Sequence, residues 1–259
     1  MANEVTRGRF VWHELMTKEP TAAQTFYKQV VGWDTSKWEE SSIDYTMWML
    51  GDAPVGGVMD IPPEAKEMGA PPNWLAYVEV PNVDQTVEQA TKLGGKVLAA
   101  ARDVPRVGRF AVLQDPQGAV FAVITNETPM PEETDPKPRE FSWHELVTTD
   151  YKAAEGFYNA LFGWDTKSDF DMGPMGIYHI FGRDRFSYGG MFNKPADMPA
   201  PPHWLHYVRV DSADAAAERA TKAGGTVVQG PMEVPGGDRI AQILDPQGAM
   251  FAVHSKAIA

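Results

Sequence analysis

The tetrapeptide Trp-His-Glu-Leu occurs twice in the chain, at 12–15 and at 143–146, and it groups three side chains that can do chemistry. An indole ring offers a flat apolar face, an imidazole can bind a metal ion or move a proton, and a carboxylate accepts protons and hydrogen bonds. Neighbouring side chains of a β-strand point to opposite faces of the sheet. We therefore expect Trp12 and Glu14 on one face and His13 on the other, with the same arrangement in the second copy.

These segments belong to a long internal repeat. The motif Phe-Tyr followed by Gly-Trp-Asp-Thr occurs at 26–35 and again at 157–166, and Asp-Pro-Gln-Gly-Ala occurs at 115–119 and at 245–249. The copies lie 131 positions apart in the first half of the repeat and 130 positions apart in the second half. Solenoid repeats run at roughly 20–50 residues, so a period of this length indicates a duplicated domain.

Between the two copies, residues 127–138 are rich in proline and charge and have almost nothing to bury. This composition predicts an exposed, semi-extended linker. The sequence therefore predicts a first module at 8–126 and a second module at 139–256.

Each half of a module follows the same plan. The hydrophobic pattern predicts a strand, then a helix ended by glycine, then two or three further strands. In the first module we expect strands at 10–16, 45–50, 55–59, 74–80, 109–113 and 119–124, and helices at 21–31 and 83–93. The expected fold class is α+β.

Composition excludes several classes of function. The formal net charge of -12 disfavours binding to nucleic acid or to an anionic membrane, because either would be repelled. The absence of cysteine excludes disulfides, thiolate metal sites and cysteine nucleophiles. No signal-like apolar stretch opens the sequence and no apolar run of about 18 residues occurs, so we expect a cytoplasmic location.

Four further side chains are candidate ligand contacts because of their places in the expected strands. Tyr45 and Tyr178 follow the first helix of each module, and Arg109 and Arg239 begin the next-to-last strands. An arginine at the rim of a binding site can meet an anionic ligand, although a lone arginine is usually solvated or paired. The loop at 171–176 differs between the modules and is a candidate cover for one pocket.

The ordered set of motifs resembles the vicinal oxygen chelate superfamily, which includes glyoxalase I, extradiol dioxygenases and bleomycin-resistance proteins. The likeness is carried by Phe-Tyr-x4-Gly-Trp, by the Gly-Gly-x-Val segments at 94–97 and 224–227, and by the closing Asp-Pro-Gln-Gly turns. The chain is most similar to two-module bacterial proteins often labelled hydroxylase or glyoxalase-like. The resemblance implies two tandem glyoxalase-like modules, each made of two βαβββ units whose curved sheet forms a cup for a ligand or a metal.

The resemblance also implies where a divalent metal would be bound, through His, Gln or Glu side chains on the concave face. The family spacing places these ligand positions on residues that cannot bind a metal: Trp12, Leu75 and Ala122 in the first module and Trp143, Leu205 and Ala252 in the second. A register shifted by one residue would instead turn three histidines inward, His13, His144 and His206. We expect no cofactor, and these histidines are the residues that would hold a divalent metal.

Three functions are open to such a chain. We expect a protein that binds a small apolar or aromatic molecule in its cups without the family metal. The alternative is a lyase or an oxygenase-type enzyme, glyoxalase-like or a hydroxylase, that uses Glu14 or Glu145 as a base, or a metal held by the histidines. In a third reading the modules only associate with a partner. Paired modules in one chain favour a monomer or a weak dimer, with a small-molecule ligand and neither nucleic acid nor membrane as partner.

Overall fold

The computed structural model describes residues 7–257 and contains two eight-stranded sheets. The elements of the first module are β1 (Phe10–Thr17), α1 (Pro20–Val30), β2 (Asp34–Lys37), β3 (Tyr45–Leu50), β4 (Ala53–Asp60), α2 (Pro63–Glu67), β5 (Asn73–Glu79), α3 (Val83–Lys92), β6 (Lys96–Val104), β7 (Gly108–Gln114) and β8 (Val120–Asn126). Those of the second module are β9 (Phe141–Thr148), α4 (Tyr151–Phe162), β10 (Asp165–Asp171), the 3-10 turn η1 (Gly173–Met175), β11 (Ile177–Arg183), β12 (Phe186–Asn193), β13 (His203–Arg209), α5 (Ala213–Lys222), β14 (Thr226–Glu233), β15 (Arg239–Leu244) and β16 (Met250–Ser255).

Both sheets have the same strand order. The first runs β2-β3-β4-β1-β5-β8-β7-β6, and the second runs β10-β11-β12-β9-β13-β16-β15-β14. In each βαβββ unit, the strand before the helix pairs in parallel with the last strand, as β1 does with β4 and β5 with β8. The other neighbouring strands of the same βαβββ unit pair antiparallel. These mixed sheets confirm the predicted α+β fold of two tandem modules.

The two helices with expected ranges, α1 and α3, begin and end within one residue of the prediction, whereas α2 was not expected. Pro20 starts α1, where its fixed backbone suits the first turn, and Gly32 with φ +89° follows the end of that helix. Gly163 ends α4 in the left-handed conformation that glycine adopts without strain. The side chains of Asn82 and Ser212 cap α3 and α5 by accepting a backbone hydrogen bond.

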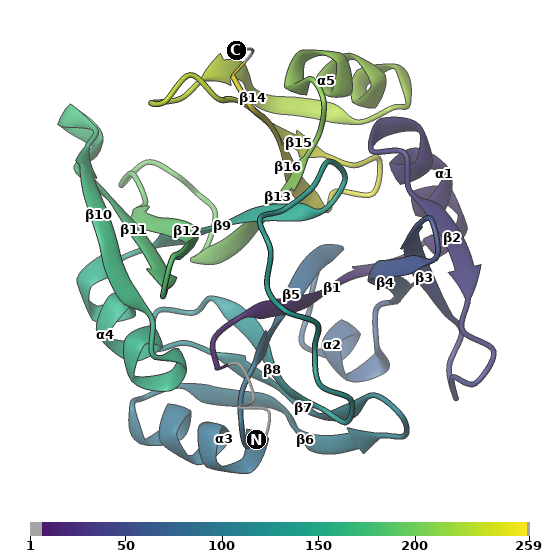
Figure 1. Ribbon diagram of the computed structural model, residues 1–259, viewed down its shortest axis with the longest axis vertical. Coiled ribbons are helices and arrows are strands. Elements are labelled where there is room, and N and C mark those ends of the chain that lie inside the picture. The colour runs from purple at the N-terminus through teal and green to yellow at the C-terminus, as the bar shows by residue number, and fades with distance from the viewer. Residues whose placement is uncertain (1–6, 258–259) are drawn as a thin grey trace. The chain divides into compact units, whose positions relative to one another are not determined.

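The compact units of the structure do not follow the two halves of the sequence. One unit, here the α3–α4 unit, contains the described residues up to Val11 together with 76–134 and 143–204. The other, the α1–α5 unit, contains 12–75, 135–142 and the described residues from Leu205 onward. Helices α3 and α4 contact each other in the first unit, and α1 and α5 contact each other in the second (Figure 1). Each unit thus combines half of one module with half of the other.

The buried core of the α1–α5 unit is built from residues of both repeats. Most of its aromatic side chains come from the first repeat, and the small alanines of α5 pack with them: Phe26, Tyr27, Trp33, Trp48 and Trp74 with Ala213, Ala216, Ala217 and Ala220. The α3–α4 unit has the corresponding cluster around Phe157, Tyr158, Phe162 and Trp164. Small residues on one helix admit the bulky aromatic face of the other, which keeps the interior close-packed.

The repeated Phe-Tyr and Asp-Pro-Gln-Gly motifs are joined by hydrogen bonds inside each unit. In the α1–α5 unit, Trp74 Nε1 donates to the Tyr27 hydroxyl at 2.9 Å, and that hydroxyl donates to Asp245 at 3.3 Å. In the α3–α4 unit, Tyr158 donates to Asp115 at 2.9 Å. These two repeated motifs are therefore part of the buried framework of each unit.

Residues 127–138 contain neither helix nor strand, as expected for a linker, but they are anchored at several points. Tyr188 donates a hydrogen bond to Glu133 at 3.0 Å, and Arg209 donates to the carbonyl of Pro136 at 2.6 Å. Burial raises the pKa of Glu133. Among the described residues, no helix has the length and apolar character needed to cross a membrane.

Candidate functional site

The two copies of Trp-His-Glu-Leu lie in β1 and β9, and the strands separate their side chains onto two faces. Leu15 belongs to the buried core beneath α1, so the neighbouring Glu14 lies on the face turned away from that helix. Leu146 has the same role beneath α4, and Glu145 lies on the opposite face. Both carboxylates are buried, with 9% and 7% of their surface exposed.

On that face a tyrosine joins the tryptophan to the glutamate. In the second module Trp143 Nε1 donates to the Tyr178 hydroxyl at 2.8 Å, and this hydroxyl donates to Glu145 Oε2 at 3.0 Å. We call this arrangement, and its counterpart in the first module, the Trp–Tyr–Glu chain. It connects three of the side chains that the sequence singled out.

The first module contains the same chain. Trp12 Nε1 donates to the Tyr45 hydroxyl at 2.9 Å, and that hydroxyl is hydrogen-bonded to Glu14. Burial, followed by the negative charge of Glu14, raises the pKa of Tyr45 well above its ordinary value. The phenol therefore stays protonated at neutral pH and donates its hydrogen bond to the glutamate. The glutamate is the hydrogen-bond acceptor at the end of the chain.

A glycine beside each glutamate makes the chain possible. Gly57 pairs with Glu14 across β4 and β1, and Gly190 pairs with Glu145 across β12 and β9. A Cβ atom on Gly57 would lie 1.9 Å from the Tyr45 hydroxyl oxygen. The tyrosine ring can cross the strand only because this side chain is missing. The Gly-Gly pairs at 56–57 and 189–190 are the sequence feature that marks this close approach.

Arg109 and Arg239 do not lie where a rim contact was expected. Arg109 makes two hydrogen bonds of 2.9 Å to Asp84 in the first turn of α3, and Arg239 bonds Asp214 of α5 at 2.6 and 2.7 Å. Each guanidinium is directed to the helix side of its sheet. The reason is the alternation of β7 and β15, which puts these arginines on the same face as the buried core.

The positions that the family resemblance assigns to metal ligands carry apolar side chains. Leu75, Leu205, Ala122 and Ala252 are all buried and supply no oxygen, nitrogen or sulfur atom. The residues at these positions therefore do not fit a divalent metal.

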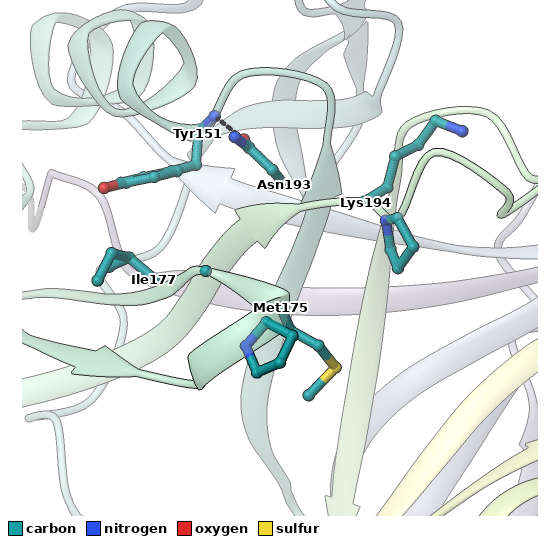
Figure 2. Close-up of a pocket in the computed structure, with 8 residues that line it drawn as sticks. Tyr151, Met175, Ile177, Asn193 and Lys194 are labelled. Atoms are coloured by element: carbon teal, nitrogen blue, oxygen red, sulfur yellow. Dashed lines mark hydrogen bonds between the residues drawn. The ribbon is translucent and has the colours of Figure 1, made fainter.

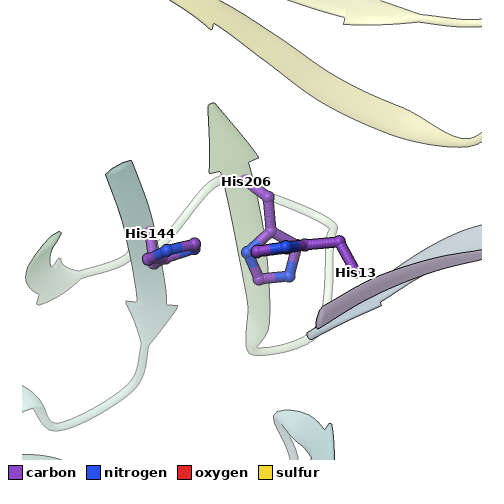
Figure 3. Close-up of side chains that lie close together, drawn as sticks. All are labelled: His13, His144 and His206. Atoms are coloured by element: carbon purple, nitrogen blue, oxygen red, sulfur yellow. The ribbon is translucent and has the colours of Figure 1, made fainter. Parts of the chain in front are cut away.

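The three histidines lie on the other face of their strands from the glutamates. In the α1–α5 unit, His13 and His206 are buried, their ring centroids lie 5.2 Å apart at 72°, and their ligand nitrogens lie within 4.8 Å (Figure 3). His13 also stacks on Phe141 at 3.7 Å. His144 belongs to the α3–α4 unit, where it stacks on Phe10 at 3.7 Å. Imidazoles are common ligands of transition metals, so His13 and His206 are residues that could hold such an ion.

The loop at 171–176 lines a pocket of about 290 Å³ in the α3–α4 unit (Figure 2). Its walls include Pro174, Met175 and Tyr151, with Asn193 and Lys194 at the end of β12. None of the residues that line it belongs to the Trp–Tyr–Glu chain of the second module. The loop therefore borders a separate pocket near the start of α4 and does not line the site around Glu145.

Comparison with known proteins agrees with the fold. Residues 140–253 match the model of the Glyoxalase/Bleomycin resistance protein/Dioxygenase superfamily, and residues 12–124 match a glyoxalase-like domain. The chain is 33% identical to "Putative glyoxylase CFP32" of Mycobacterium bovis, covering 98% of this chain and 97% of that protein. It is 30% identical to the anthracycline biosynthesis protein DauV of Streptomyces sp. strain C5, covering 95% and 92%.

Solved structures share the fold at low sequence identity. The 2,3-dioxygenase LapB from Pseudomonas sp. KL28 superposes with a TM-score of 0.67 at 11% identity, over 98% of this chain and 94% of that one. The Mn(II)-bound glyoxalase from Novosphingobium aromaticivorans gives a TM-score of 0.62 at 16% identity, over 98% and 83%. With full-length relatives at 30% identity and above, the chain belongs to the glyoxalase/bleomycin resistance/dioxygenase superfamily.

Proposed function

We propose that each module binds a small apolar or aromatic molecule on the face that carries its Trp–Tyr–Glu chain, without a metal at the family's ligand positions. The observation that supports this most strongly is the occurrence of the same hydrogen-bond chain in both modules. A partly exposed indole ring can stack on an apolar ligand, and a buried carboxylate beside it can accept a hydrogen bond from the ligand.

The direction of the hydrogen bonds defines the polar group that the ligand should carry. Trp143 donates to the Tyr178 hydroxyl, which in turn donates to Glu145, and a carboxylate can accept several hydrogen bonds through its two oxygens. The favoured ligand is therefore a flat molecule with a hydroxyl or N–H donor. One relative is named for anthracycline biosynthesis, and anthracyclines are aromatic molecules, which supports a ligand of this kind.

The second candidate function is an enzyme of the lyase or oxygenase type. It is favoured by the burial of Glu14 and Glu145, because a carboxylate held away from water next to a bound molecule can act as a general base. A relative named glyoxylase and a solved Mn(II)-bound glyoxalase of the same fold point the same way. A metal in this protein would use His13 and His206, on the face opposite the glutamates.

We propose a cytoplasmic monomer or weak dimer whose partner is a small molecule, since the net charge of -12 opposes binding to nucleic acid and to anionic membranes.

Calorimetric titration with 2-naphthol, an aromatic molecule with one hydroxyl donor, tests the proposal. We expect two binding sites per chain in the natural protein and one in either Trp12→Ala or Trp143→Ala. Leu93→Ala removes an exposed apolar side chain at the end of α3, 42% of which is open to solvent, and should keep both sites. Two sites that persist in both tryptophan variants would disprove the assignment.

A further inference from the structure

A second group of polar side chains lies in the α1–α5 unit, apart from the Trp–Tyr–Glu chains. Ser142 comes from β9, Asp238 directly precedes β15, and His254 comes from β16. His254 Nε2 lies 2.8 Å from Asp238 Oδ2, and His254 Nδ1 lies 3.1 Å from Ser142 Oγ. The three residues lie in or next to three separate strands, so their spacing in the sequence does not predict that they lie close together.

The chemistry of the partners decides which nitrogen of His254 carries the proton. An ionised carboxylate only accepts hydrogen bonds, so Nε2 donates to Asp238 and Nδ1 is left as an acceptor. Partial burial would raise the pKa of Asp238, but the hydrogen bonds from His254, from the backbone N–H of Ala257 and from Lys256 outweigh burial and lower this pKa to about 2. Asp238 is therefore ionised at neutral pH.

The state of His254 completes the arrangement. Burial lowers the pKa of His254, and this outweighs the opposing effect of Asp238. The neutral imidazole can then accept the hydroxyl proton of Ser142 at Nδ1. The alternative acceptor for that proton is the carbonyl of Tyr207, which lies farther away at 3.4 Å.

The first module provides a natural comparison. At the positions equivalent to Ser142, Asp238 and His254, which lie 131 or 130 residues earlier, it has Val11, Gly108 and Ile124. None of these side chains can form a hydrogen bond, yet β1, β7 and β8 form the same strands in the same order. The fold therefore does not require the polar group, and the second module carries it for another reason.

We propose that Ser142 is a nucleophilic serine that accepts an acyl group from an activated ester, with His254 as its general base and Asp238 as the residue that positions the imidazole. Serine hydrolases use the two ring nitrogens in the opposite sense, but the requirement is the same: a carboxylate fixes the tautomer and the free nitrogen takes the proton. The site would take small carboxylic esters, a substrate class different from the ligand of the Trp–Tyr–Glu chain.

The reaction follows from the hydrogen bonds. Ser142 Oγ attacks the ester carbonyl carbon while its proton passes to His254 Nδ1. The C–O bond to the leaving alcohol then breaks, and His254 returns the proton to that alcohol, which leaves an acyl-serine. Water, deprotonated in the same way by His254, hydrolyses the acyl-serine to a carboxylic acid and restores the hydroxyl.

The surroundings suit this chemistry. The side chains of His254 and Asp238 are 14% and 22% exposed, so a small ester can approach a group that is otherwise shielded from water. The charged groups that act on His254 are Asp238, Lys256 and Arg209. The two cations disfavour protonation of the imidazole and so help to keep it neutral.

The test uses p-nitrophenyl acetate on the full chain, with mass spectrometry to locate the acetyl group. We expect acetylation of Ser142 in the natural protein, none at this position in Ser142→Ala, and a labelling rate lower by about 10²-fold in His254→Gln. Labelling should also fall as the pH is lowered, because a protonated imidazole cannot accept the serine proton. Ser187, an exposed serine of β12, is the internal reference for unassisted reactivity.

A double variant, Ser142→Val with His254→Ile, copies the first module and should fold, bind 2-naphthol at both sites and show no labelling at position 142. The proposal is overturned if Ser142 reacts no faster than Ser187, or if His254→Gln reacts as fast as the natural protein. If the natural protein does not bind 2-naphthol, only the ligand-binding proposal is contradicted. The titration with 2-naphthol and the acetylation of Ser142 report on different residues.

Discussion

The ring of Tyr178 crosses β12 directly over Gly190, and a Cβ atom at that position would lie 2.0 Å from a ring carbon. This close approach lets the Tyr178 hydroxyl reach Glu145 on the next strand, 3.0 Å away. The site of the second module thus depends on an absent side chain.

Gly190→Ala should displace Tyr178 and destroy the Trp–Tyr–Glu chain of the second module only. We expect one 2-naphthol site per chain by calorimetry and a loss of about 1–3 kcal/mol in the free energy of unfolding, the usual cost of overpacking. The control is Gly156→Ala in α4, where an added Cβ meets nothing within 4 Å and should stabilise the protein slightly. Two unchanged sites in Gly190→Ala would show that Tyr178 takes no part in binding.

Glu145→Gln separates binding from catalysis. The amide keeps the shape of the side chain and removes its charge, so affinity at this site for 2-naphthol should fall by about tenfold while that for naphthalene, which has no donor, stays the same. If the protein is an enzyme, the same variant should lose the turnover that depends on this site. Unchanged affinity and unchanged turnover together would show that Glu145 takes part in neither binding nor catalysis.

Phe157→Ala tests the framework. Phe157 is 4% exposed and packs in the core of the α3–α4 unit, so its removal should destabilise the protein by roughly 3–5 kcal/mol. Phe170→Ala, at an exposed position, should leave the melting temperature nearly unchanged. Equal melting curves for the two variants would mean that α4 buries a different face.

Asp238 should make stability sensitive to acid. Its pKa is about 2 in the folded protein and 3.8 ordinarily, so its contribution is present above pH 3.8 and is lost as the pH falls toward 2. Asp238→Asn should cost roughly 2 kcal/mol in the free energy of unfolding at neutral pH, and the difference from the natural protein should vanish near pH 2. Chemical denaturation at a series of pH values measures this, with Asp197→Asn at an exposed position as the control. A difference that does not change with pH would contradict the assignment.

The purified chain should contain little tightly bound metal. Because Leu75, Leu205, Ala122 and Ala252 offer no ligand atoms, we expect far less than one equivalent of Zn, Ni, Mn or Fe per module in protein purified without chelator. Elemental analysis of the purified chain measures it. A stoichiometric ion would overturn the expectation, and His206→Ala, which copies Ala76 of the first module, would then show whether the histidines hold it.

The local pattern of the sequence was sufficient to predict much of the framework. The alternation of Trp12, His13 and Glu14 predicts their faces because the side-chain period of a strand is two, and glycines mark helix ends because they tolerate the left-handed conformation. The repeat itself predicts two modules, because a segment that folds once under given local preferences does so again.

The partners of those residues were decided only by the tertiary structure. Tyr27 hydrogen-bonds Asp245 of the other module, and not Asp115 of its own, although the turns around these two aspartates have the same sequence. Local chemistry cannot distinguish identical turns. The choice accompanies the packing of α1 against α5 within one compact unit. In the same way, Arg109 pairs with Asp84 of α3, and the ring of Tyr45 packs over Gly57 of the neighbouring strand, through contacts between elements that are separate in the sequence.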